Sequence, residues 1–302
     1  MLLSADRHRS VAHEMPALPT FFIIGAPKAG TTSLHLYLDQ HPEIQMSANK
    51  EPRYFAGPEN GVPYPPGRVS TLDEYEALFD PSVAVRGEAS TDYAFHPRRE
   101  GVPARIKRLV PDARFLYLVR DPIARTISHY KMRVAFLGER RPLTQVLADL
   151  SDPASPYVWP SLYASQLERY LSAFPLERIM VVDQADLLSE RERTLREIFS
   201  FLDVTPDVTS ERFHERLSDS REWRAYSFWY SRLVDSVIAP AARWVPASAR
   251  RSVRRSLERH LWPEVETPSL DPDLERRLHT MFGNEADRLR ALTGQAFSSW
   301  SV

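Results

Sequence analysis

The chain has no cysteine among its 302 residues. Disulfide bonds, thiolate zinc sites and a catalytic thiol are therefore excluded, while the redox compartment stays open. Long apolar runs are absent as well: no stretch approaches the roughly 20 residues that cross a bilayer, and residues 1–20 hold no signal-peptide core. We therefore expect a soluble, cytoplasmic protein.

The formal net charge is close to zero, and the chain contains little glycine. The 39 basic residues nearly balance 40 acidic ones, giving a formal net charge of −1, so the composition indicates no nucleic-acid partner. Ten glycines against 25 prolines favour long, stiffened loops, and no internal repeat is visible. A chain of this length can bury a sizeable core as one large α/β domain.

The most informative stretch is 21–33, FFIIGAPKAGTTS. Its apolar start predicts a buried strand, followed by a turn over 25–30 and a helix from Thr31. Such a unit directs backbone N–H groups and the positive end of a helix dipole at one point, which suits a phosphate or sulfate. The candidate anion-binding residues are Lys28, Ala29, Gly30, Thr31, Thr32 and Ser33.

This loop differs from a Walker A motif, in which the lysine directly follows the second glycine. Here Thr31 follows Gly30, and Lys28 lies inside the loop. The sequence P-K-A-G-T-T-S resembles the 5′-phosphosulfate loop of sulfotransferases that use 3′-phosphoadenosine 5′-phosphosulfate (PAPS). The resemblance implies PAPS as donor, adenosine 3′,5′-bisphosphate (PAP) as product, no metal, and a P-loop-like α/β fold with a central parallel sheet flanked by helices.

A second segment, 114–131, repeats the pattern of strand, charged turn and helix. Arg120 ends the strand, and Ser128 lies eight residues on. Sulfotransferases carry a similar arginine and serine that hold the 3′-phosphate, a role that suits the planar guanidinium fork. The resemblance covers most of 20–205, and is closest in kind to bacterial and heparan-sulfate-type sulfotransferase domains.

Alternating strands and helices predict a parallel sheet with helices on both faces. Ligands of such folds bind beyond the carboxyl ends of the strands, where Lys28, Glu88 and Arg120 fall. We expect strands at 21–25, 84–88, 114–119 and 178–183, and helices at 31–40, 101–109, 122–137, 161–173 and 190–202. Residues 1–19 are expected to form an extension and 20–302 a single domain, with a cofactor-binding core at 20–205 and a helical C-terminal part rich in arginine and aromatic residues at 206–302.

The segment NKEPRYFA at 49–56 resembles the K-E-x-x-F-F stretch of heparan-type sulfotransferases. The resemblance implies that Glu51 is the catalytic base. Glu88 is the second candidate and an expected acceptor-site residue, because related enzymes carry a similar glutamate at this strand end. There it is often followed by a lysine, which Ala89 replaces here, and Ala56 stands where the heparan 3-O branch has an acid. Both departures argue against a highly sulfated polysaccharide acceptor.

Histidine is the base in aryl and steroid sulfotransferases, but the candidates here are less well placed than Glu51. His41 most simply ends a helix. His96 and His129 are nearer the expected cleft, but His129 follows Ser128 on a helix, where packing is the more common role. Ser90 and Tyr93 are candidates to line the acceptor pocket.

The C-terminal part carries fewer signals. Arg221 and Arg224 stand where the family's basic loop closes over the nucleotide. Residues 228–262 mix aromatics with arginines, which fits a solvated helix pair, an acceptor lid or a patch for peripheral membrane contact.

These residues predict a sulfotransferase that moves a sulfuryl group to the hydroxyl of a sugar, glycolipid or secondary metabolite. Lys28 is expected to stabilise the leaving phosphate and Glu51 to deprotonate the acceptor during in-line transfer. Two alternatives remain open at this point: an ATP-dependent P-loop kinase and a non-catalytic PAP-binding protein. The acceptor and the oligomeric state cannot be read from the sequence.

Overall fold

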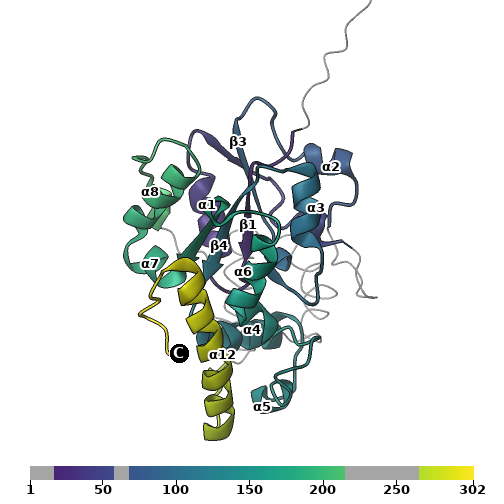
Figure 1. The fold of residues 1–302 in the computed structure, drawn as a ribbon, viewed down its shortest axis with the longest axis vertical. Coiled ribbons are helices and arrows are strands. Elements are labelled where there is room, and N and C mark those ends of the chain that lie inside the picture. Colours follow the sequence, from purple (N-terminus) through teal and green to yellow (C-terminus); the bar gives the residue numbers. More distant parts are fainter. Residues whose placement is uncertain (1–16, 58–67, 215–264) are drawn as a thin grey trace, which may run out of the picture.

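A five-stranded parallel sheet lies at the centre of the computed structural model, which describes residues 17–57, 68–214 and 265–302 (Figure 1). The strand order is β2-β3-β1-β4-β5, and each pairing is parallel. This architecture confirms the expected fold class. The strands are β1 (Phe21–Gly25), β2 (Ile44–Met46), β3 (Val85–Ala89), β4 (Arg114–Val119) and β5 (Ile179–Asp183).

Helices connect the strands and cover the sheet (Figure 1). The α-helices in the described residues are α1 (Thr31–Leu38), α2 (Leu72–Glu76), α3 (Val102–Leu109), α4 (Pro122–Phe136), α5 (Leu143–Val146), α6 (Tyr163–Leu171), α7 (Gln184–Ser189), α8 (Arg191–Phe201) and α12 (Pro272–Thr293). Short 3₁₀ turns include η1 (Tyr54–Ala56) and η2 (Thr91–Ala94), which follow β2 and β3.

The central strand β1 is buried along its whole length, as expected for a continuous apolar run in a parallel sheet. Phe22 stacks on Phe115 of β4, with ring centroids 5.7 Å apart. On the other side, β3 can approach only because residue 87 is glycine: a Cβ there would lie 2.1 Å from the ring of Phe21. These contacts fix β1 between its two neighbours.

Aspartate side chains begin several of the helices, as their preference for N-cap positions predicts. Asp121 accepts a hydrogen bond from the Ala124 N–H at the start of α4, where Pro122 takes the first helical position. Asp183 caps α7, and Asp271 caps α12. The cap at Asp121 also fixes the direction in which the chain leaves β4.

The long helix α12 returns the C-terminal part to the core. It lies beside α6 and α4, as Figure 1 shows in yellow. Leu274, Leu278 and Phe282 pack in a second apolar cluster that includes Ile123 of α4. Within the described residues, no helix is both long and apolar enough to traverse a bilayer.

Candidate active site

The loops that follow β1 and β4 meet at the carboxyl edge of the sheet. From β1 the chain proceeds towards β2 on one side, and from β4 it proceeds towards β5 on the other. Ligands of open α/β sheets bind at such a switch point. The guanidinium of Arg120 closes the contact, because its Nη1 donates to the carbonyl oxygen of Lys28 at 3.2 Å.

The loop between β1 and α1 has the conformation of an anion-binding turn. Gly30 precedes α1 with φ 98°, and Lys28 has φ 75°, so both residues are left-handed. This geometry turns the chain directly into the N-terminal turn of α1, where backbone N–H groups have no helical acceptor. Thr31 and Thr32, in that first turn, line a cleft.

Positive charge is concentrated around this loop. Burial, together with the neighbouring cations Arg120, Arg125 and Lys50, lowers the pKa of Lys28 to about 8. Arg125 is fully buried, which lowers its pKa to about 10, and its Nη1 lies 3.5 Å from the carbonyl oxygen of Pro27. An anion bound in the loop would relieve this mutual repulsion, so the residues present fit a phosphosulfate group.

Glu51 faces the same cleft and is held by four side-chain donor contacts. Lys50 Nζ lies 3.2 Å from Oε1, and Thr91 Oγ1 donates to that oxygen at 3.1 Å. Arg53 donates to Oε2 from Nε at 3.0 Å and from Nη2 at 2.7 Å. Burial pushes the pKa of Glu51 upward, but the charges and hydrogen bonds of Lys50 and Arg53 prevail and hold it below its usual range. The carboxylate is therefore ionised at neutral pH.

The cleft has a volume of about 580 Å³ and a mainly basic lining. It is formed by the loops after β1, β2 and β3, the start of α1 and residues of α4 that include His129 and Arg133. Its charged residues are Lys28, Lys50, Arg53, Arg98, Arg99 and Arg133 against Glu51 and Asp92. Both acids contact arginine, since Arg53 Nε and Arg99 Nη2 lie 3.6 and 3.8 Å from Asp92 Oδ2. The arrangement favours an anionic ligand.

Backbone strain gathers at the same place. Lys28, Glu51 and Arg53 all line the cleft, and all have positive φ, at 75°, 66° and 56°. Each such residue costs on the order of 1 kcal/mol and persists only where the surroundings impose it. Their gathering around one cavity supports a functional site there.

The remaining predicted cofactor residues are placed around the loop. Ala29 is fully buried, Gly30 and Ser33 are partly exposed, and Ser128 is buried on α4. Arg120 and Ser128 do not line the cleft itself, so their grip on a 3′-phosphate stays a prediction. Arg221, Arg224 and the arginine-rich segment 228–262 lie outside the described residues.

Glu88 is placed differently from the expectation of an acceptor-site base. It is completely buried and does not line the cleft. Its carboxylate instead accepts hydrogen bonds from three hydroxyl groups, on Tyr75, Ser90 and Tyr93. In this structure Glu88 is therefore an internal residue, and its role as a base or acceptor-site residue stays a prediction.

Of the histidines, His129 does line the cleft. Burial and the adjacent cation Arg125 lower its pKa well below the ordinary value, so the ring is neutral. Its Nδ1 lies 3.2 Å from Arg125 Nη1. Because arginine can only donate, Nδ1 must accept and Nε2 must carry the proton, which leaves no free basic nitrogen. His41 is buried, with Nε2 2.8 Å from the Thr205 carbonyl oxygen, and His96 does not line the cleft.

Sequence reasoning missed Arg53, Asp92 and Arg125. Arg53 stands two residues after Glu51, and its charge next to a candidate base was the available signal. An arginine on a helix such as α4 is expected to be exposed to solvent, yet Arg125 is fully buried. No pattern in the sequence distinguishes it from Arg133, which is only partly buried on the same helix.

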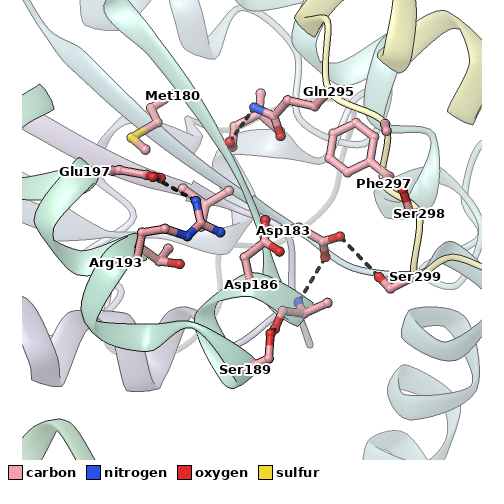
Figure 2. Close-up of a pocket in the computed structure, with 15 residues that line it drawn as sticks. Met180, Asp183, Asp186, Ser189, Arg193, Glu197, Gln295, Phe297, Ser298 and Ser299 are labelled. Carbon is pink, nitrogen blue, oxygen red and sulfur yellow. Dashed lines mark hydrogen bonds and ion pairs between the residues drawn. The ribbon is translucent and has the colours of Figure 1, made fainter.

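A second cavity of about 580 Å³ is lined by residues of β5, α7, α8 and the segment after α12 (Figure 2). Two of its charged groups have partners within the protein: Arg193 Nη1 lies 2.7 Å from Glu197 Oε1, and Asp183 accepts hydrogen bonds from the Ala185 N–H and from Trp300 Nε1. We place the chemistry in the first cleft, because the loop after β1 lies there.

The chain is similar to sulfotransferases in sequence. A family model described as a sulfotransferase domain matches residues 18–231, more than half of the chain. Bifunctional heparan sulfate N-deacetylase/N-sulfotransferase 2 of Bos taurus is 29% identical over 216 residues, 65% of this chain and 23% of that protein. Heparan sulfate glucosamine 3-O-sulfotransferase 3B1 of Homo sapiens is 27% identical over 206 residues, 65% of this chain and 49% of that protein. The chain thus spans about a quarter of the length of the first of these curated relatives and about half of the second.

The likeness extends to three dimensions. The crystal structure of a sulfotransferase from Alicyclobacillus acidocaldarius matches this fold with a TM-score of 0.68 at 25% identity. The match covers 95% of this chain and 100% of the other.

Proposed function

This chain belongs to the sulfotransferase domain family, and on that premise we propose that it transfers the sulfuryl group of PAPS to an acceptor hydroxyl. The observation that carries the proposal is the single cleft that holds Lys28, the start of α1 and the carboxylate of Glu51. In-line transfer to an alcohol requires a positively charged site that binds the anionic donor and a base that accepts the proton of the alcohol, here a carboxylate.

The donor contributes a phosphosulfate whose sulfuryl group is attacked by the acceptor oxygen, leaving PAP. On the protein side, the loop at 26–30 and the N-terminal turn of α1 hold the 5′-phosphate. Lys28 places its positive charge where the leaving phosphate gains negative charge. Arg120, whose guanidinium lies against the same loop, holds the 3′-phosphate together with Ser128. Arg221 and Arg224 remain candidates for the same nucleotide.

Glu51 accepts the proton of the acceptor hydroxyl. It is ionised at neutral pH, since Lys50 and Arg53 keep its pKa below the ordinary range. Those two cations also limit its intrinsic basicity, so its contribution rests on position beside the reacting hydroxyl. Glu88 is sealed in the core, and the hydrogen bond from Arg125 leaves His129 without a basic nitrogen. Of the two carboxylates that line the cleft, Glu51 and Asp92, we propose Glu51 as the base because its segment is the one that resembles the K-E-x-x-F-F stretch.

For the acceptor we propose a sugar, glycolipid or secondary metabolite, with a carbohydrate as the first choice. The names of the curated relatives specify heparan sulfate, which supports a carbohydrate. Basic side chains on the cleft's lining, including Arg98 and Arg133, are compatible with such a ligand and with the anionic donor.

The test is sulfuryl transfer itself. Purified protein is incubated with ³⁵S-labelled PAPS and pools of sugars, glycolipids and phenols without added metal, with the Glu51→Gln variant as a parallel control. We expect label in an acceptor with the wild type and little with Glu51→Gln. Tight PAP binding without transfer to any pool would contradict an enzymatic function and favour a PAP-binding protein. Transfer of the ATP γ-phosphate in the presence of Mg²⁺ would instead indicate a kinase.

A further inference from the structure

Glu88 occupies an unusual position for an acid. It lies at the carboxyl end of β3 with no exposed surface. Tyr75 Oη and Tyr93 Oη donate to its Oε1 at 2.6 and 2.8 Å, and Ser90 Oγ donates to its Oε2 at 2.9 Å. Three neutral hydroxyls thus surround a carboxylate, with no arginine or lysine bonded to it among the described residues.

Two of these hydroxyls reach further, to the backbone of the loop that carries Glu51. Ser90 Oγ accepts a hydrogen bond from the N–H of Arg53 at 3.0 Å. Tyr93 Oη accepts one from the N–H of Phe55 at 3.2 Å. A hydroxyl that donates to Glu88 has its lone pairs turned towards the loop, so the carboxylate fixes the direction of both contacts.

The loop needs such fixing because its conformation is strained. Both Glu51 and Arg53 have positive φ. Arg53 in turn holds Glu51 through two hydrogen bonds to Oε2. If the N–H of Arg53 loses its acceptor, the left-handed backbone at that residue can relax, and its guanidinium moves with it.

We infer that Glu88 is a positioning residue, which holds the Arg53–Phe55 backbone through Ser90 and Tyr93 and thereby sets the place of Glu51 in the cleft. The inference rests on the proposed function, in which Glu51 is the base. It gives Glu88 a role that needs no access to the acceptor. Burial, which raises the pKa of Glu88 to about 7, is consistent with a carboxylate whose partners are all neutral.

The chain offers a matched control. Tyr75 and Tyr93 are both buried and donate to the same oxygen of Glu88, but only the Tyr93 hydroxyl also accepts from the loop backbone. Tyr93→Phe and Ser90→Ala each remove one of the two hydroxyls that connect Glu88 to the loop backbone. Tyr75→Phe also removes a hydroxyl that donates to Glu88, but it leaves both connections to the loop backbone in place.

Three quantities are measured for each variant: kcat with the acceptor found in the transfer screen, PAP affinity by calorimetry, and the pKa of Glu51. The pKa comes from ¹³C NMR of protein labelled at the glutamate carboxyl carbon, with the Glu51 signal assigned by its loss in Glu51→Gln. This readout needs no acceptor. Thermal unfolding is recorded to confirm that every variant is folded.

We expect Ser90→Ala and Tyr93→Phe to lower kcat on the order of tenfold to hundredfold, with PAP affinity within about twofold of the wild type. The pKa of Glu51 should rise in both variants, because a displaced Arg53 no longer offsets burial. Tyr75→Phe should leave kcat and this pKa close to the wild-type values. A purely structural Glu88 would make Tyr75→Phe as harmful as Tyr93→Phe, and that result overturns the inference.

An unchanged Glu51 pKa in Ser90→Ala and Tyr93→Phe overturns it as well. If Glu51 is not the base, Glu51→Gln retains its turnover, whatever the effects of Ser90→Ala and Tyr93→Phe. The role of Glu51 as base and the role of Glu88 in positioning it are therefore tested separately.

Discussion

At the scale of single residues, Lys28 combines two properties that an anion site needs. It sits at a left-handed position in the loop after β1, and burial with three nearby cations lowers its pKa to about 8. The side chain is mostly protonated at pH 7, but its proton is held less tightly than in solution. A bound phosphate stabilises the charged form and raises the pKa again.

PAP affinity should therefore depend on pH. Below about 8 the free protein already carries the Lys28 proton, and affinity should be flat; above it, binding must take up that proton, so affinity should fall by at most about tenfold per pH unit. Lys28→Arg keeps its charge and should show no such fall. Calorimetry between pH 6.5 and 9.5 measures both, and a wild-type affinity that stays constant to pH 9.5 would contradict this reading of Lys28.

The Glu51→Gln variant tests the base at the same scale. The amide keeps the size of the side chain and loses its proton acceptor, so kcat should fall by roughly 10²- to 10⁴-fold. PAP affinity should stay within about twofold, because Glu51 is not a ligand of the nucleotide. Glu192→Gln, an exposed substitution on α8, is the matched control and should leave both values unchanged. Equal turnover in the two variants would remove Glu51 from the mechanism.

At the scale of elements, the C-terminal segment after α12 ties the ends of two strands together. Trp300 Nε1 donates to Asp183 Oδ2 at 3.1 Å, at the end of β5. The next residue, Ser301, donates to Asp121 Oδ2 from both N–H and Oγ, each at 2.6 Å. Asp121 directly follows Arg120, so this segment supports the corner at which the 3′-phosphate is proposed to bind.

Replacing Trp300 should therefore weaken the fold markedly. Its indole packs on Phe297 and Tyr163 and is only 8% exposed, so Trp300→Ala should lower the free energy of unfolding by about 3–5 kcal/mol. Ser299→Ala removes a long 3.4 Å bond to the same aspartate, visible in Figure 2, and should cost less than about 1 kcal/mol. Urea denaturation followed by circular dichroism measures both, and similar losses would show that the indole is not an anchor.

The elements differed in how far the sequence could predict them. The unit from β1 to α1 and the unit from β4 to α4 were predicted within two residues, because a long apolar run followed by a turn leaves little choice. The strand β2 has three residues and α2 has five, too short for a periodic pattern. The sequence located the end of β3 that carries Glu88. It did not predict towards which face of the sheet the carboxylate points, because a strand buried on both faces shows no alternation of polar and apolar residues.

At the scale of the whole molecule, net charge is a poor guide to the ligand. The chain carries a formal charge of −1, yet the cleft gathers six basic residues and two acids. A low-dielectric cleft focuses the field of its own charges, so an anion experiences the lining and not the total. This is why composition alone predicted neither the sign nor the place of the binding site.

The free energy of unfolding should depend on pH through the titration of Glu88. Its pKa is raised from 4.5 to about 7, so the native state holds that proton more tightly than the unfolded chain does. The stabilisation is fully present below pH 4.5 and is lost as the pH rises through 7, a difference of up to about 3 kcal/mol. Between pH 5 and 8 the wild type should lose stability relative to Glu88→Gln. Parallel stability curves for the two proteins, measured by urea denaturation, would contradict the buried acid.

The proposed site recognises a nucleotide by its 3′-phosphate, which Arg120 would hold beside the cleft. Calorimetric titration of the metal-free protein with PAP, ADP and AMP, repeated on Arg120→Ala, tests it most directly. We expect tight binding of PAP, much weaker binding of ADP and AMP, and loss of the preference for PAP in Arg120→Ala. Binding of ADP as tight as that of PAP, above all if Mg²⁺ strengthens it, would rule out a site for the 3′-phosphate.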